Sequence, residues 1–275
     1  MKTGAAAVAL ILAGMFGPAA ALADPLPIRV GWVVTPGHLA PLIEALGKRE
    51  AGVFKHLGQS YVLQTTRFQG TTPQIQAQAI GDLDVAALST AALALAITNA
   101  KLEERVVADV VADGVEGFFT ENYVVAADSP IKTIEDIKGK RIATNAIGSA
   151  SDAVGPTQAV LWGMRAETIA AHRPVFVDFF EDHIRAVRWF IDQNNREEAL
   201  DILAGVTKLP KESLGFAFSK DDFYHSPDAR PELDSVQREI DEAVKLGVLP
   251  QRVEIRPKHV DLSLIEEAKK RIDGK

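Results

Sequence analysis

Short runs of β-forming residues alternate with helical patterns through residues 28–111, and this order limits the possible folds more than any other feature of the chain. Strands are predicted at 28–34, 61–68, 85–88 and 106–111, and helices at 39–46, 73–80 and 91–101. Parallel strands need long crossover connections, and each right-handed crossover packs its helix against the sheet. The order βαβαβαβ therefore predicts an α/β fold with a mostly parallel sheet covered by helices on both faces.

The second half of the chain becomes mainly helical. We expect strands at 123–127, 140–145 and 159–164, a short helix at 131–136, and helices at 199–203, 236–244 and 262–272. Apolar residues recur at helical spacing in a further segment: Phe176, Phe180, Ile184, Val187 and Ile191. This stripe predicts one long helix that begins at Pro174, because proline is tolerated in a first helical turn.

The N-terminus has the pattern of a secretory signal peptide. Lys2 supplies a positive charge, residues 5–16 are apolar, and Ala21, Leu22 and Ala23 form a small-residue cleavage pattern. A membrane anchor is the alternative, but the apolar run is shorter than the ~20 residues that span a bilayer. We therefore expect residues 1–23 to be removed and the mature chain to begin at Asp24 in the periplasm.

Composition narrows the class of protein further. The chain has no cysteine, so a disulfide framework, a cysteine-based metal site and the cysteine of a bacterial lipid anchor are excluded. It has 37 acidic against 30 basic residues and no basic tract, which disfavours a nucleic-acid or anionic-membrane binder. We expect a monomer without a cofactor or a metal, with no nucleic-acid partner and no direct membrane insertion.

Candidate ligand-binding residues follow the predicted strands. In an open parallel sheet, ligands bind beyond the carboxyl ends of the strands, where loops meet helix N-termini. Glycine and hydroxyl residues there would let backbone N–H groups approach an anion. The candidates are Pro36, Gly37, His38, Gly70, Thr71, Thr72, Ser89, Thr90, Asn145, Gly148, Ser149 and Ser151. Ordinary helix capping by serine and threonine is the alternative explanation for each loop.

Patterns that indicate an enzyme are scarce. The stretch 148–151 lacks the second glycine of a hydrolase nucleophile elbow, and neither a P-loop nor a dinucleotide fingerprint occurs in the chain. Four histidines have no partner at metal-ligand spacing and are predicted to be surface or half-buried: His172, His183, His225 and His259. We expect Trp162 and Trp189 in the core. The charges of the long helix, Asp178, Glu181, Asp182, Arg185 and Arg188, are expected on a solvated face.

Several short segments, taken in their order and spacing, resemble one family. They are the opening strand 28–31, the turn 68–70, the turn and strand 81–86, the segment 131–143 followed by Gly148 and Ser149, and the segment 165–189. Together they resemble the nitrate/sulfonate/taurine class of ABC-transporter binding proteins across nearly all of the mature chain.

The resemblance implies a type II periplasmic binding protein-like fold of two lobes with parallel-rich sheets, which close on a ligand by hinge motion. Lobe I would comprise residues 24–125 and 166–275, and lobe II residues 126–165. The ligand would be a small, anionic, nitrogen- or sulfur-containing organic compound such as nitrate, a sulfonate or taurine. The partners would be a permease and its ATPase subunit, and the protein would not be an enzyme.

The chain departs from the family pattern in its second lobe, where roughly fifty residues are missing between the Gly148–Ser149 turn and the strand at 159–164. What remains of this lobe, about residues 128–161, is shorter than the ~40 residues below which a domain usually needs extra support to hold a core. We therefore expect weakened or absent ligand binding. Two alternatives stay open: a pyrimidine-binding or synthase-like protein, although the synthases rely on a cysteine that this chain lacks, and a binding-deficient remnant.

Overall fold

The computed structural model describes residues 24–120, 122, 124–133, 135–141, 143 and 157–274. The expected signal peptide at 1–23 lies outside these ranges, as do the candidate residues Asn145, Gly148, Ser149 and Ser151. No helix of the described ranges combines the length and the apolar character that a bilayer crossing requires.

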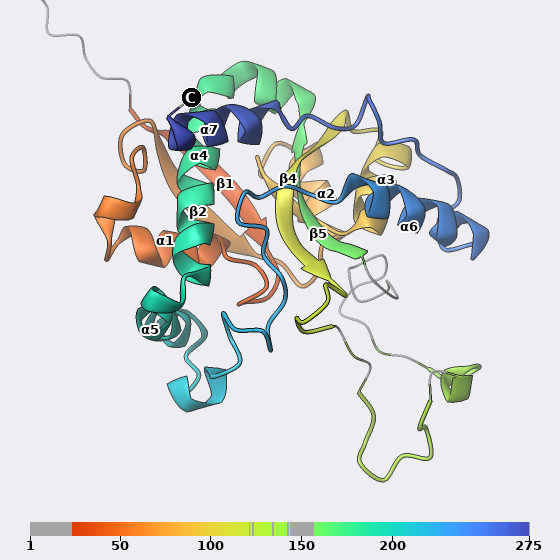
Figure 1. Cartoon of the computed structure of the whole chain (residues 1–275). Helices are drawn as coiled ribbons and strands as arrows, with labels where there is room; N and C mark the ends of the chain where they lie inside the picture. Colours follow the sequence, from red (N-terminus) through yellow and green to blue (C-terminus); the bar gives the residue numbers. More distant parts are fainter. Residues whose placement is uncertain are drawn as a thin grey trace, which may run out of the picture.

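A mixed sheet forms the centre of the fold (Figure 1). Strand β1 (Leu26–Trp32) pairs in parallel with β2 (Tyr61–Arg67), from Leu26 opposite Tyr61 to Trp32 opposite Arg67. Strands β3 (Ala86–Leu88), β5 (Thr157–Arg165) and β4 (Glu104–Asp113) follow in that spatial order. A parallel bridge between Val30 and Val85 joins the two groups of strands. The order across the sheet is therefore β2-β1-β3-β5-β4.

Strand β5 corrects one expectation. It lies antiparallel between β3 and β4, so the sheet is less parallel than the βα alternation predicted. It lies in the segment 126–165 and pairs with strands of the segment 24–125, while the division into lobes stays a prediction. The reason for this pairing is its unbroken apolar run, which is buried from Ala159 to Trp162. Such a strand needs cover on both faces, and only the interior of a sheet provides it.

Helices cover both faces of the sheet, as predicted. Helices α2 (Pro73–Ala79), α3 (Thr90–Thr98) and α6 (Leu233–Lys245) pack around one apolar cluster with Leu88 and Leu161. Helices α4 (Ala166–Ile191) and α7 (Ser263–Asp273) pack against the opposite face with Val30 and Trp162. Helices α1 (Ala40–Gly47) and α5 (Arg196–Thr207) share a third cluster with the end of α4.

Helix α4 begins eight residues before the predicted start at Pro174. Its backbone leaves helical geometry at His172, with a φ of −137°, and Pro174 lies inside the helix, where it cannot donate a backbone hydrogen bond. The predicted apolar stripe is confirmed, since Phe176, Phe180, Ile184 and Val187 are all buried.

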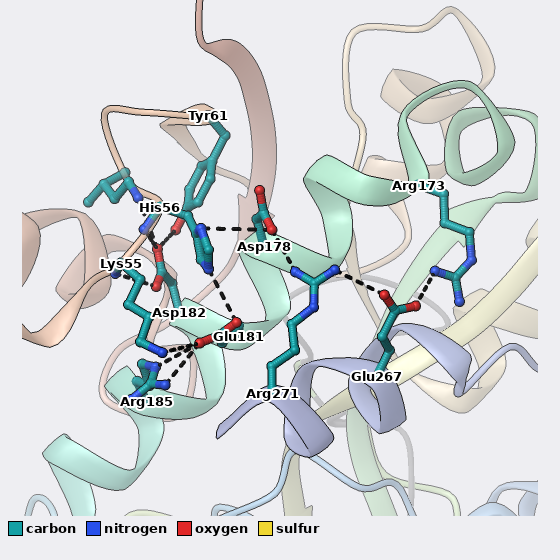
Figure 2. Close-up of polar contacts among 11 residues, drawn as sticks. Lys55, His56, Tyr61, Arg173, Asp178, Glu181, Asp182, Arg185, Glu267 and Arg271 are labelled. Carbon is teal, nitrogen blue, oxygen red and sulfur yellow. Dashed lines mark hydrogen bonds and ion pairs between the residues drawn. The ribbon is translucent and has the colours of Figure 1, made fainter. Parts of the chain in front are cut away.

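The charged face of α4 is not solvated as expected. Asp182 is fully buried and accepts hydrogen bonds from the backbone N–H groups of residues 55–57 at 2.8–2.9 Å and from the Tyr61 hydroxyl at 3.1 Å. Glu181, 2% exposed, pairs with Lys55 at 3.1 Å and Arg185 at 2.9 Å (Figure 2). The loop before β2 supplies these donors, and it lies more than 120 residues upstream. The expectation was wrong because a pattern within the helix cannot indicate so distant a partner.

Two further expectations are corrected. Residues 124–126 form no strand, and the predicted helix at 131–136 is reduced to one 3₁₀ turn at Glu135–Ile137. His183, His225 and His259 are buried, whereas only His172 of the four is exposed as expected. Trp162 lies in the core, as predicted.

Candidate functional site

One edge of the sheet gathers the ends of four strands. Strands β1, β2 and β3 run in parallel, and β3 and β4 share one direction because both are antiparallel to β5. The chain therefore leaves β1, β2, β3 and β4 at the same edge, here called the carboxyl edge, where β5 begins. The three described loops with predicted ligand residues, 36–38, 70–72 and 89–90, lie at this edge, as the strand-end argument predicted.

The second and third loops touch each other. The Thr71 hydroxyl donates to the Ser89 Oγ atom at 3.1 Å, and both residues are buried. The same Ser89 Oγ accepts the Ala92 backbone N–H at 3.1 Å and caps helix α3. Capping, which the sequence left open as an alternative, is thus one role of Ser89. Gly70 and Thr72 flank Thr71, and Thr72 directly precedes α2.

The first loop is packed by a segment distant in sequence. His38 is 3% exposed, and its Nδ1 accepts the Val33 backbone N–H at 3.2 Å, which requires an unprotonated Nδ1. Burial, with a smaller contribution from nearby His225, lowers the pKa of His38 to about 3. Gly37, next to Pro36, faces the ring of Phe223. His38 is therefore neutral and holds the loop from inside.

The segment 222–226 is a part of the carboxyl edge that sequence reasoning missed. Tyr224 forms a bridge with Ala112 at the end of β4, and His225 Nδ1 lies 3.0 Å from the Val110 carbonyl oxygen. Its contacts join residues about 115 positions apart, so no local pattern could have indicated it. Asp109 of β4 accepts the backbone N–H of Ser226, a residue of this segment, at 3.1 Å. Burial raises the pKa of the Asp109 carboxyl to about 7.

Buried polar atoms without a hydrogen-bond partner occur at this edge. Among the described residues of this edge, they are Trp32 Nε1 and His225 Nε2. A buried unpaired donor or acceptor costs about 1–3 kcal/mol, so each needs a reason to persist. A site that receives a polar ligand supplies such a reason.

Two charged groups complete the edge. Arg67, exposed at the end of β2, places its guanidinium 5.8 Å from the centre of the Trp32 ring. Glu239 of α6 lies beside Thr90, and burial raises the pKa of its carboxyl to about 7, with Asp113 adding to the rise and the Thr90 hydroxyl and Arg238 opposing it. Neither Arg67 nor Glu239 was singled out by sequence reasoning.

Metal binding has no support in the described part of the chain, where no group of three or more histidine and carboxylate side chains could hold an ion. The polar groups described at the carboxyl edge are hydroxyls, the Arg67 guanidinium, carboxyls and histidine and tryptophan ring nitrogens. This set suits recognition of a small polar molecule.

Comparison with known proteins agrees with this reading of the fold. Residues 50–176 match the family described as "ABC transporter, phosphonate, periplasmic substrate-binding protein". The match spans less than half of the chain, so it shows a likeness to ABC-type periplasmic substrate-binding proteins over this part. The predicted resemblance to the nitrate/sulfonate class agrees with it at this level, although the matching family is the one described for phosphonate. No curated protein matches this chain.

Solved binding proteins share its fold. The alkanesulfonate-binding protein SsuA from Xanthomonas axonopodis pv. citri, bound to MOPS, superposes with a TM-score of 0.63 at 16% identity, covering 87% of this chain and 99% of its own. The nitrate-binding protein NrtA from Synechocystis PCC 6803 has a TM-score of 0.61 at 15% identity, covering 91% and 90%. The ligand-binding component of an ABC-type import system from Staphylococcus aureus, with zinc bound, has a TM-score of 0.57 at 15% identity, covering 88% and 99%. At such identities the likeness establishes the periplasmic binding protein fold, not a ligand.

Proposed function

We propose that this chain is a periplasmic binding protein that captures a small, anionic, nitrogen- or sulfur-containing organic compound and delivers it to the permease and ATPase of an ABC importer, without chemical turnover. The observation that carries the proposal is the carboxyl edge, because the hydroxyl-bearing loops, the start of α3 and Arg67 at the end of β2 all lie on this one edge of the sheet. The ligands named for two structural neighbours, MOPS and nitrate, support an anion.

The predicted ligand residues keep their proposed role. Pro36, Gly37 and His38 would form one wall, Gly70, Thr71 and Thr72 the second, and Ser89 and Thr90 the third. Asn145, Gly148, Ser149 and Ser151 stay predicted ligand residues outside the described ranges. Export by the signal peptide at 1–23, a monomeric state and the division into lobes belong to the same proposal. Because the second lobe is short, we expect affinity weaker than micromolar.

A thermal-shift screen of the purified mature chain tests the proposal. The panel is nitrate, ethanesulfonate, ethylphosphonate and their amine-bearing analogues. Binding to the native state alone raises stability by RT ln(1 + [L]/Kd), so a ligand at ten times its Kd raises Tm by about 3–6 °C in a chain of this size.

Two variants of α3 provide a matched pair. Thr90→Val removes a hydroxyl at the carboxyl edge, whereas Thr98→Val removes a buried hydroxyl at the far end of the same helix, where it donates to the Ala94 carbonyl oxygen at 2.8 Å. We expect Thr90→Val to reduce the ligand response and Thr98→Val to retain it. Equal responses of the two variants, or no response of the wild type to any anion, would contradict the proposal.

A further inference from the structure

Two glutamines of helix α2 are fully buried, and both contact the central sheet. Gln74 and Gln78 lie one helical turn apart. A buried amide is tolerated where hydrogen bonds replace those it made to water, so each glutamine fixes α2 against the groups that it contacts. Gln78 contacts Glu104 and Gly163 in the sheet. Gln74 lies nearer the carboxyl edge, where loop 70–72 leads into α2.

The side chain of Gln74 takes the place of a strand partner. Beside β3, the Val85 N–H donates to the Arg29 carbonyl oxygen of β1 at 3.1 Å, and the Gly31 N–H donates to the Val85 carbonyl oxygen at 2.9 Å. In a regular parallel ladder, the next N–H of β3, that of Ala87, would donate to the Gly31 carbonyl oxygen. It donates instead to Gln74 Oε1 at 2.9 Å. The amide therefore separates β1 from β3 at the carboxyl edge.

Gly31 makes room for this amide. A Cβ atom on Gly31 would lie 2.1 Å from Gln74 Oε1 and 2.9 Å from Gln74 Cδ. Atoms in a packed interior do not approach so closely, so a larger residue at this position would displace the Gln74 side chain. A glycine inside a strand is typical of a site where another group comes close to the backbone.

The same glutamine holds loop 70–72. Gln74 Nε2 donates to the Gly70 carbonyl oxygen at 3.5 Å, a long hydrogen bond. The Thr71 hydroxyl contacts Ser89, the residue that follows β3, at 3.1 Å. Because β1 lies between β2 and β3, these contacts draw the loop that follows β2 across the end of β1. Gln74 thus fixes loop 70–72 where β1 and β3 separate.

The helices that follow β1 and β3 leave this point on opposite faces of the sheet. Ala40 of α1 packs in the apolar cluster of α4, whereas α3 packs with α2 and α6 on the other face. In an open α/β sheet, ligands bind beyond the carboxyl ends of the strands at such a point of divergence.

We propose that Gln74, seated against Gly31, is a positioning residue that holds loop 70–72 in its ligand-binding place between the ends of β1 and β3. The inference rests on the proposed function, because it assigns the support of one wall of that site. Gln74 is 0% exposed, so it acts through the loop and does not touch the ligand.

Amide hydrogen exchange of the mature chain tests the positioning in the absence of any ligand. Gln74→Met keeps the length of the side chain and removes its hydrogen bonds, so the amides of residues 70–72 and of Ala87 should exchange about tenfold faster than in the wild type. Gln78→Met is the matched control, because it removes the second buried glutamine of α2, one turn farther from the loop. It should change exchange at 70–72 by less than about twofold. Equal acceleration in the two variants, or none in Gln74→Met, would overturn the inference.

Calorimetry with nitrate, ethanesulfonate and ethylphosphonate tests the consequence for binding. For each of these anions that the wild type binds, Gln74→Met should weaken the affinity about tenfold at a temperature where all variants are folded, and Gln78→Met by less than about twofold. Faster exchange at 70–72 with unchanged affinity would make Gln74 purely structural, which overturns the inference and leaves the proposed function standing. If none of the three anions binds the wild type, both fail.

A double-mutant cycle isolates the contact between Gly31 and Gln74. Gly31→Ala should weaken the affinity for the same anions about tenfold, because the added Cβ displaces the amide. In the Gln74→Ala background only the end of the Leu83 side chain, 3.0 Å from that Cβ, remains as a close neighbour. There Gly31→Ala should weaken the affinity by less than about threefold. Equal losses in the two backgrounds would show that Gly31 acts independently of Gln74 and would contradict the proposal.

Discussion

Glu104 of β4 lies opposite Arg165 of β5 in the sheet register, and the Glu104 side chain is completely buried. Gln78 of α2 donates to Glu104 Oε1 at 3.1 Å and also to the Gly163 carbonyl oxygen at 3.1 Å. Burial raises the pKa of Glu104 to about 7, although the Gln78 hydrogen bond and the charge of Arg165 oppose the rise. A carboxyl group at this position is thus neutral in mildly acidic solution.

Replacing Glu104 by glutamine should stabilise the protein at alkaline pH. The native state disfavours the ionised carboxylate, so the wild type loses stability as the pH rises from 4.5, the ordinary pKa, to about 7. Glutamine has nearly the same shape and no charge. We expect Glu104→Gln to raise the free energy of unfolding by about 1–3 kcal/mol at pH 8 and by less at pH 5, measured by urea denaturation. Glu103→Gln, on the exposed neighbour, should change it by less than about 0.5 kcal/mol; equal effects of both variants would refute the assignment.

His183 should make stability sensitive to acid. Trp162 Nε1 donates to His183 Nε2 at 3.3 Å, and burial, with a smaller contribution from His225, lowers the pKa of His183 to about 4. The unfolded chain takes up this proton near pH 6.5, so the stability from His183 is present above pH 6.5 and is lost as the pH falls to 4. In His183→Gln, the loss of unfolding free energy between pH 7 and pH 5 should be smaller by about 2 kcal/mol. An unchanged pH profile would show that His183 titrates normally.

The buried carboxylate of Asp182 anchors the loop before β2 to helix α4. Asparagine would offer one acceptor oxygen instead of two, and its NH₂ group would face the backbone N–H donors of His56 and Leu57. We expect Asp182→Asn to lower the free energy of unfolding by about 2–4 kcal/mol, by the loss of charge-assisted hydrogen bonds. The matched control is Asp201→Asn, because Asp201 is 52% exposed and pairs with Lys211. Ligand affinity should not change, since Asp182 lies near the amino ends of β1 and β2, away from the carboxyl edge. A loss of affinity without a loss of stability would contradict a purely structural role for Asp182.

Ser89→Ala separates capping from ligand binding. The loss of the Ala92 N–H bond should cost about 1 kcal/mol of stability, as is typical for an N-cap serine. If Ser89 also contacts the ligand, affinity should fall beyond what the stability change explains, as measured by calorimetry at a temperature where both variants are folded. Unaltered affinity would restrict Ser89 to its capping role. The exposed Ser213, whose hydroxyl donates to Pro210, provides a serine-to-alanine control.

The arrangement of the carboxyl edge was only partly predictable. Loops 36–38, 70–72 and 89–90 were found because strand direction alone places them on one edge. Arg67 follows the same rule, since it ends β2, but exposed arginines are too common to single out. Glu239 and His225 could not be found, because they reach the edge only when α6 and the segment 222–226 pack against β4 and α3.

The sequence by itself determined the order of strands and helices from β1 to β4, the apolar stripe of α4 and the direction of β1 to β3, because hydrophobic periodicity and turn residues act between near neighbours in the chain. The tertiary structure alone decided that β5 enters the sheet antiparallel, that Asp182 is buried and that Glu239 meets Thr90. Each of these depends on partners far apart in sequence. A polar or charged side chain is tolerated in the interior only where the folded chain supplies its hydrogen-bond or ion-pair partner. The local sequence pattern does not indicate that partner.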